Sequence, residues 1–285
     1  MAQYDTDKPK DPMAMSLHES EWQETDKSFW HDYIPFYEQH LPEQICGLIV
    51  EFGVFKGASL RWLLAKFPDA QIVGVDIEQP APDWPKDPRI RYVTLDQGDQ
   101  NAVQGFFSGT PYPELIIEDG SHIPLHQSLC LKYGLKALTH GGVYVLEDIH
   151  TSHPAHQLYK DEFSTRMATR GSLGCLGAQL LRRQTSYHQT SLSTLLAMEH
   201  LKRLGKKSLT PQEVEILSYG THFNAVEIQN MFESIWEIYT YRRSKLPLRC
   251  YNCHGTAFDY HKLKCMCGTD LLAEADSMSV IIKKK

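Results

Sequence analysis

The sequence predicts an α/β fold with a mostly parallel sheet that is closed by an antiparallel hairpin. From Leu48 onward, short apolar runs rich in β-branched residues alternate with helical segments across short links. This alternation is typical of parallel strands with helices on both faces. Several of the apolar runs also stop at acidic residues, as strands do at the edge of an open sheet where ligands bind.

The expected parallel strands lie near residues 48–52, 71–75, 90–94, 114–118 and 142–147. Residues 20–45, rich in aromatic and acidic side chains, predict one or two helices ahead of them. Later helices are expected at Ser191–Leu204 and from Thr210, where Thr-Pro-Gln-Glu combines a capping box with proline at the first helical position. The hairpin is expected at Phe223–Met231 and Ser234–Arg242, where β-branched and aromatic residues alternate.

The chain of 285 residues has room for one large domain and a small appendage. We expect a flexible leader at 1–19, a main domain at 20–245 and a small separate module at 246–285 that ends in a strand-like run, Ser279–Ile282. The net charge of −6 argues against broad nucleic-acid or anionic-membrane binding. No apolar stretch approaches the roughly 20 residues of a membrane span, and Met1–Ser16 lacks the apolar core of a signal peptide. A cytoplasmic location is the resulting expectation.

Two acidic motifs follow predicted strands and indicate an active site. The first is Glu118-Asp119-Gly120-Ser121-His122, and the second is Glu147-Asp148. Oxygen-rich clusters suit a hard divalent cation, and a nearby histidine suits a general base. Asp119-Gly120 could instead be a simple tight turn, but its position at a strand end, with an acidic pair at the next strand, favours a functional site. The neighbouring histidines His126, His150 and His153 could share or replace the role of His122.

A glycine turn after the first strand indicates the cofactor. Glu51, Gly53, Gly57 and Ser59 form the pattern E-x-G-x-x-x-G-x-S, and Asp76 ends the second strand twenty-five residues after Glu51. Such an acid is well placed to hold ribose hydroxyls. The pattern lacks the G-x-G-x-x-G run that cradles a pyrophosphate. A cofactor with a ribose but no phosphate, S-adenosylmethionine, is therefore expected.

Four of the seven cysteines gather near the end of the chain. Cys250, Cys253, Cys265 and Cys267 form a C-x₂-C and a C-x-C pair, whereas Cys46, Cys130 and Cys175 are scattered. Thiolates at this spacing can wrap a tetrahedral Zn²⁺, as in a zinc ribbon or rubredoxin-like knuckle, and stabilise a module too small for its own core. His254 or His261 could replace one thiolate, iron could replace zinc, and reduced cysteines without metal are the alternative.

Taken together, the motifs resemble the macrocin and mycinamicin type of sugar O-methyltransferases, which are class I enzymes that depend on S-adenosylmethionine and Mg²⁺. The resemblance spans roughly residues 25–245 and excludes the cysteine module. It is carried by Thr25-Asp26-Lys27, Glu51–Ser59, Asp76, Gln97-Gly98-Asp99-Gln100, Asp119–His122 and Glu147-Asp148.

The resemblance implies a class I methyltransferase fold and assigns roles to the motif residues. Asp119, Glu147 and Asp148 would bind Mg²⁺, with His122 as general base. The cofactor would contact Glu51, Gly53, Gly57, Ser59, Asp76 and Asp119, with Asp99 and Gln100 near its adenine end. Glu118 stands where the family more usually has aspartate. The family also implies a homo-oligomer.

The expected activity is methyl transfer to a hydroxyl of a sugar or polyhydroxylated small molecule, as in antibiotic biosynthesis. Two alternatives stay open at this point. One keeps the cofactor but changes the acceptor to a catechol-like phenol or another hydroxylated natural product. The other is a non-catalytic methyltransferase-like module that binds a partner through its cysteines.

Overall fold

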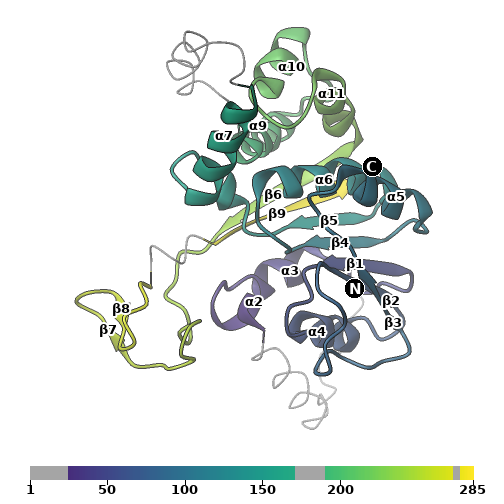
Figure 1. The fold of residues 1–285 in the computed structure, drawn as a ribbon. Coiled ribbons are helices and arrows are strands. Elements are labelled where there is room, and N and C mark those ends of the chain that lie inside the picture. Colours follow the sequence, from purple (N-terminus) through teal and green to yellow (C-terminus); the bar gives the residue numbers. More distant parts are fainter. Residues whose placement is uncertain (1–24, 171–189, 272–276) are drawn as a thin grey trace, which may run out of the picture.

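The computed structural model describes residues 25–170, 190–271 and 277–285. The predicted leader at 1–19 and Cys175 lie outside the described residues. A seven-stranded sheet in the order β3-β2-β1-β4-β5-β9-β6 runs through the molecule (Figure 1). Its strands are β1 Leu48–Phe52, β2 Gln71–Asp76, β3 Ile90–Thr94, β4 Leu115–Glu118, β5 Val143–Leu146, β6 Ile235–Arg242 and β9 Met278–Lys284.

The first five strands are parallel, as predicted. The central strands β1, β4 and β5 consist mainly of buried apolar residues, because helices cover both of their faces. The chain leaves β1 toward β2 on one side and returns to β4 on the other, so the strand order reverses between β1 and β4. Open α/β sheets bind ligands at such a switch point, beyond the carboxyl ends of the strands.

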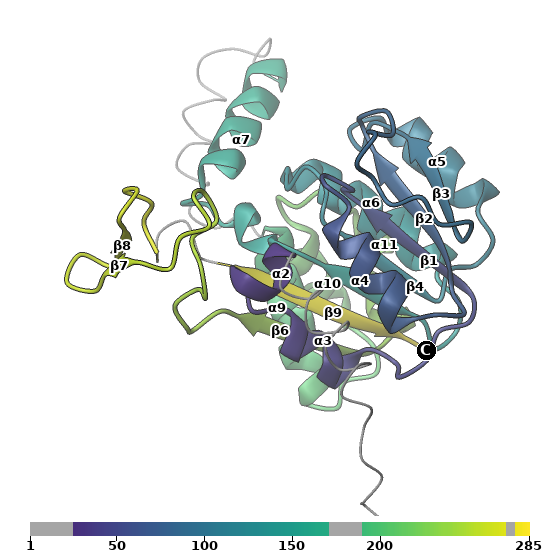
Figure 2. The ribbon, with the colours of Figure 1, turned by 90° about the horizontal axis from the view of Figure 1, so that it is seen from below.

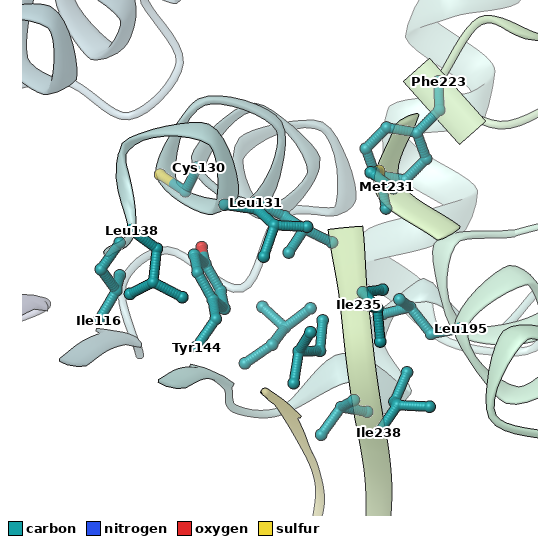
Figure 3. Packing of buried hydrophobic residues seen from close by; sticks show 14 of the residues in the cluster. Ile116, Cys130, Leu131, Leu138, Tyr144, Leu195, Phe223, Met231, Ile235 and Ile238 are labelled. Carbon is teal, nitrogen blue, oxygen red and sulfur yellow. The ribbon is translucent and has the colours of Figure 1, made fainter. Parts of the chain in front are cut away.

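Two layers of helices enclose the sheet (Figure 1). The helices α3 Ile34–His40 and α4 Ala58–Lys66 pack on one face. The other face is covered by α5 Gln100–Gly109, α6 Pro124–Ala137, α9 Ser191–Arg203, α10 Pro211–Ser218 and α11 Ala225–Ser234. Figure 3 shows part of this second core, where Tyr144 and Ile235 of the sheet meet Leu131 of α6 and Leu195 of α9.

The remaining helices are α2 Asp26–Phe29, the short 3₁₀ helix η1 Ile149–Ser152 and α7 Gln157–Arg170. One or two helices were expected within 20–45, and the structure has two there, α2 and α3. The capping box at Thr210 begins α10 as predicted. Among the described residues, every helix is too short or too polar to cross a membrane.

The hairpin prediction was wrong in its first arm. Phe223–Met231 lies mostly within α11, whose N-cap Asn224 accepts a hydrogen bond from the Glu227 amide at 2.9 Å. The Glu227 carboxylate in turn accepts one from the Asn224 amide at 2.9 Å, which completes a capping box. This local cap fixes a helix despite the β-branched alternation. The second arm is β6, which pairs antiparallel with β9 instead.

The predicted module at 246–285 also needs correction. Its strand-like end is β9, which inserts between β5 and β6 and belongs to the main sheet. The cysteines therefore lie in an excursion between β6 and β9, residues 243–277, which we call the cysteine excursion. It contains the small strands β7 Phe258–Asp259 and β8 Lys264–Cys265 and projects from the α2 side of the molecule (Figures 1 and 2).

Candidate active site

A cavity of about 910 Å³ opens beyond the carboxyl ends of the parallel strands. Its lining includes Gly53 after β1, Asp76 at the end of β2, Asp119 and His122 after β4, and Asp148 after β5. These residues meet because the register pairs Phe52 with Glu118, and Glu118 with Leu146, so the strands end side by side. The volume suits a ligand of cofactor size.

The glycine turn after β1 forms one wall of the cavity. Gly53 has a φ of +88°, and a β-carbon built on it would lie 2.0 Å from the carbonyl oxygen of Asp119. Asp76 Oδ2 accepts hydrogen bonds from the amides of Val54 at 2.8 Å and Phe55 at 3.2 Å. Gly57 caps α4 at a φ of +70° outside the cavity lining, whereas Ser59 lines the cavity. The turn thus brings backbone close to any ligand in the cavity.

Replacing Gly53 by alanine should destabilise the protein, because the new methyl group would meet the β4 loop backbone in a left-handed conformation. We expect a loss of about 1–3 kcal/mol in the free energy of unfolding. Gly105 in α5 is the matched control, since a β-carbon there meets no other atom within 4 Å, and Gly105→Ala should be stabilising by roughly 0.5–1 kcal/mol. Denaturant unfolding of both variants checks this, and equal stabilities would contradict the close approach.

A buried lysine to which the sequence motifs assigned no role, Lys27, is among the residues that line the cavity. The ammonium of Lys27 contacts Asp119, lies 2.7 Å from Glu147 Oε1 and 3.7 Å from Glu51 Oε1, and its side chain is only 1% exposed. Burial alone would lower the pKa of Lys27, but Asp119, Glu147 and Glu51 together raise it well above its usual value. Lys27 therefore stays charged and offsets three carboxylates.

Glu51 is the one of these acids that extends from strand β1. It is fully buried in β1, and neither of its carboxylate oxygens accepts a hydrogen bond within the described residues. Burial raises the pKa of Glu51 to about 7, against the opposing effect of Lys27. Glu51 lies outside the cavity lining. It therefore acts on the site only through its ion pair with Lys27 and does not contact a ligand in the cavity.

Asp148 is surrounded by a tyrosine hydroxyl and three imidazole rings. The Tyr33 hydroxyl donates to Asp148 Oδ1 at 2.6 Å, and ring nitrogens of His31, His122 and His150 lie 3.8 to 3.9 Å from its carboxylate. Burial would raise the pKa of Asp148, but the three histidines outweigh it and lower that pKa below its usual range. Asp148 also has a φ of +49°, a strained backbone conformation. Such strain is often found where a functional side chain must be held in one position.

His122, the predicted general base, both lines the cavity and lies next to a carboxylate. Its Nε2 lies 3.8 Å from Asp148 Oδ2, and its side chain lines the cavity while 32% exposed. Burial lowers the pKa of His122, but Asp148, Asp119 and Glu118 outweigh that effect and raise it.

The three alternative histidines make other contacts. His126 also lines the cavity, but its Nδ1 is 2.8 Å from the Ser121 hydroxyl, and burial lowers its pKa. Burial lowers the pKa of His150 to about 4. His153 is exposed and accepts a hydrogen bond from the Ala155 amide at 3.1 Å.

Part of the predicted magnesium set comes together. Ligand atoms of Asp119, His122 and Asp148 all lie within 4.8 Å of one another at the cavity wall. Carboxylate oxygens are the ligands that Mg²⁺ takes in proteins, so this donor set fits the ion. Glu147, the third predicted carboxylate, is buried against Lys27 and lies outside this group.

The QGDQ motif contributes a different residue to the cavity than predicted. Asp99 caps α5, accepting from the amides of Asn101 and Ala102, and neither Asp99 nor Gln100 lines the cavity. Gln97 of the motif lines it instead, together with Asp96 directly before the motif. The Gln97 amide nitrogen donates to Glu118 at 2.8 Å and its oxygen accepts from the Ser121 amide at 2.9 Å, so Gln97 holds the loop that carries His122.

The predicted cysteine cluster is also present. The sulfur atoms of Cys250, Cys253, Cys265 and Cys267 all lie within 4.8 Å of one another and could hold a metal ion. His254 and His261, the alternatives, are not in this group.

No family model matches the chain. Among curated proteins, it is similar to 8-demethyl-8-alpha-L-rhamnosyl tetracenomycin-C 2'-O-methyltransferase of Streptomyces olivaceus, 32% identical over 163 residues, which are 53% of this chain and 41% of the relative. It is also similar to mycinamicin VI 2''-O-methyltransferase of Micromonospora griseorubida, 30% identical over 134 residues, which are 44% of this chain and 33% of the relative. The chain thus spans less than half the length of these relatives.

Solved structures show the same fold. The MycE methyltransferase of the mycinamycin pathway, in complex with Mg and SAH, matches with a TM-score of 0.54 at 19% identity, over 96% of this chain and 55% of that one. Its complex with Mg, SAH and mycinamycin VI matches with a TM-score of 0.52 at 20% identity, over 95% of this chain and 54% of that one. The predicted class I methyltransferase fold is therefore confirmed.

Proposed function

We propose that this chain transfers a methyl group from S-adenosylmethionine to a hydroxyl of a sugar attached to a natural product, in an Mg²⁺-dependent reaction. The observation that carries the proposal is one cavity lined both by the glycine turn with Asp76 and by Asp119, His122 and Asp148. A methyl donor and an acceptor hydroxyl must meet in one place for in-line transfer. The relative named as a 2'-O-methyltransferase of a rhamnosyl tetracenomycin supports the acceptor class.

The cofactor side of the cavity is the part between β1 and β2. One carboxylate oxygen of Asp76 accepts hydrogen bonds from the Val54 and Phe55 amides, and the other accepts one from the Glu78 amide at 3.0 Å. Asp76 therefore fixes the turn that faces the ligand. Gly53 and Ser59 line the same wall, and Asp96 and Gln97 approach from β3. Lys27, which also lines the cavity, offsets the charge of Asp119 at the wall and of the buried Glu51 and Glu147.

Asp76→Asn should weaken the affinity for S-adenosylhomocysteine roughly tenfold to a hundredfold, because a charged acceptor of backbone and ligand hydrogen bonds is lost. Asp69→Asn, at an exposed position before β2, is the matched control and should bind like wild type. Calorimetric titration of both variants measures the effect. Equal affinities would remove Asp76 from the cofactor site.

The acceptor side lies at Asp119, His122 and Asp148. Asp119 and Asp148 would hold Mg²⁺, with Glu147 as the third predicted ligand, and the bound ion would act as a Lewis acid on an acceptor hydroxyl. His122 is placed to take the hydroxyl proton at Nε2, and Asp148 stabilises the imidazolium that results. Gln97 keeps the His122 loop in place through the Ser121 amide.

The proposed acceptor is a small molecule rather than a nucleic acid, which agrees with the net charge of −6. Assembly into a homo-oligomer stays a prediction.

A turnover assay with labelled S-adenosylmethionine tests the proposal. Polyketides that carry a deoxysugar with two neighbouring hydroxyls are offered alongside a catechol and the sugar-free polyketide, each with and without Mg²⁺. We expect methyl transfer to the sugar only, abolished by a chelator. Transfer to the catechol alone would favour a phenolic acceptor, and cofactor binding without any transfer would favour the non-catalytic alternative.

A further inference from the structure

The four clustered cysteine sulfurs have the spacing of a tetrahedral metal site. Cys250 Sγ lies 3.6 Å from Cys267 Sγ, and Cys253 Sγ lies 3.5 Å from Cys265 Sγ. Zinc–sulfur bonds of about 2.3 Å place the corners of a tetrahedron about 3.8 Å apart. A disulfide would need sulfurs about 2.05 Å apart, and all four cysteines are free thiols.

The backbone presents the two cysteine pairs in matching turns. The Cys250 amide donates to the carbonyl of Gly255, and the Cys265 amide to that of Thr269, each at 2.8 Å. The residue that follows the second cysteine of each pair is left-handed, with a φ of +55° at His254 and +98° at Gly268. Both pairs thus turn back on themselves and present their thiols to a common point, although their spacings differ.

The cysteine excursion has almost no core of its own. Its described buried apolar residues are Pro247, Cys250, Cys265 and Leu271, and the last three pack against Phe29 and Trp30 of the α2 region. So few buried apolar side chains cannot hold such a segment together without a cross-link. A bound metal would supply it, because metal binding contributes folding free energy directly.

The same contacts tie the excursion to α2. The Leu248 amide donates to the Phe29 carbonyl at 2.8 Å, and the Arg249 guanidinium lies 4.2 Å from the centre of the Phe29 ring. Trp30 packs against Tyr251, with ring centres 6.0 Å apart. Since α2 has only four residues, its own hydrogen bonds cannot keep it folded, so it depends on these neighbours.

This contact reaches the active-site cavity at two points. Tyr251, in the loop between the first two cysteines, lines the cavity directly. Lys27, two residues before Phe29, holds Asp119 and Glu147. If the excursion loses its structure, Tyr251 at the cavity wall and the Lys27 ammonium beside the buried carboxylates should therefore lose their positions too.

We propose that Cys250, Cys253, Cys265 and Cys267 bind one structural zinc ion, and that the zinc-held excursion positions α2 and Tyr251 at the active-site cavity. The zinc site stands on the thiol geometry alone. The effect on cofactor binding also rests on the proposed function.

Metal content tests the first half. Elemental analysis of the purified protein should find about one zinc per chain. Cys253→Ser and Cys267→Ser each remove an exposed thiol and should lose most of the zinc, whereas Cys46→Ser, an exposed thiol outside the cluster, should retain it. Iron in place of zinc, or no metal taken up when zinc is titrated into metal-free protein, would overturn the assignment.

Hydrogen exchange tests the second half without any cofactor. Removal of zinc by a thiol-reactive reagent and chelator should make the amides of residues 25–41 exchange about tenfold faster or more, while those of α4 stay unchanged. Returning the thiols to the reduced state and adding zinc should restore protection. Zinc loss with unchanged exchange at 25–41 would overturn the positioning role.

A pair of tyrosine variants separates this inference from the proposed function. Tyr251→Ala should weaken S-adenosylhomocysteine binding about tenfold, and Tyr260→Ala, an exposed tyrosine of the same excursion, should not. If wild type binds no S-adenosylhomocysteine at all, the proposed function fails, while the zinc content and exchange results still decide the zinc site. Equal, measurable binding by both variants would remove Tyr251 from the positioning role.

Discussion

Replacing Lys27 by methionine is expected to lower the free energy of unfolding by about 3–5 kcal/mol, the range for removing one partner from a buried ion pair. The ammonium is 1% exposed and faces Asp119, Glu147 and Glu51. Without it, three carboxylates would have to stay buried without their counter-charge. Methionine has nearly the same length as lysine, so the loss would report charge rather than volume.

The Lys27→Met deficit should depend on pH. Burial and mutual repulsion would raise the folded-state pKa values of these acids further above their unfolded values of about 4. A raised carboxyl pKa contributes stability that is present below the unfolded pKa and lost as pH rises through the folded one. The variant should therefore lie closest to wild type below about pH 4 and lose most stability above neutral pH.

Denaturant unfolding across pH measures this, with Lys245→Met as the matched control. Lys245 is 72% exposed and pairs with Asp32 at 3.1 Å, so its loss should cost less than about 1 kcal/mol at any pH. Equal effects of the two substitutions, or a Lys27→Met deficit that does not vary with pH, would contradict the role of Lys27 as the buried counter-charge.

His122→Ala is expected to lower the rate of methyl transfer roughly 10²–10⁴-fold, the usual contribution of a general base, while S-adenosylhomocysteine still binds. The base must be neutral to accept a proton. Since Asp148, Asp119 and Glu118 outweigh burial and raise the pKa of His122 above its usual value, the wild-type rate should fall as pH drops through that raised pKa. The remaining activity of the variant should lack this acid limb.

Single-turnover rates measured against pH check the assignment. His140→Ala is the control, because His140 is exposed, does not line the cavity and is hydrogen-bonded to the carbonyl of the last residue, Lys285. A loss confined to His126→Ala, with His122→Ala nearly as active as wild type, would assign the base to the other histidine of the cavity.

The parallel half of the fold could be predicted closely from sequence. Strands β1 and β3 lie where the apolar runs placed them. Strand β1 is buried by helices on both faces and so leaves a strong continuous apolar pattern, whereas β3 is a partly exposed edge strand. The last two strands were harder. The β-branched pattern of α11 is opposed by the capping box at Asn224, and β9 pairs with a strand more than thirty residues earlier, across the cysteine excursion.

The motifs at strand ends identified several residues that line the cavity, among them Gly53, Asp76 and Asp119, because the sheet itself brings those ends together. Lys27 could not be found in this way. It lies before the first strand and reaches the site only through the tertiary packing of α2, which no local periodicity records. The Thr-Asp-Lys motif was its only signal, and that motif assigns no role by itself. Tyr251 was missed for the same reason, since a distant excursion delivers it.

Calorimetric titration of S-adenosylhomocysteine into the purified chain, with and without Mg²⁺, tests the central claim most directly. The site predicts one molecule bound per chain in both conditions, since the glycine turn and Asp76 are separate from the metal-binding acids. Asp119→Asn should alter Mg²⁺ binding in a parallel titration. If S-adenosylhomocysteine binds neither with nor without Mg²⁺, the methyltransferase assignment is contradicted. The chain would then have a methyltransferase fold whose acidic cavity serves another function.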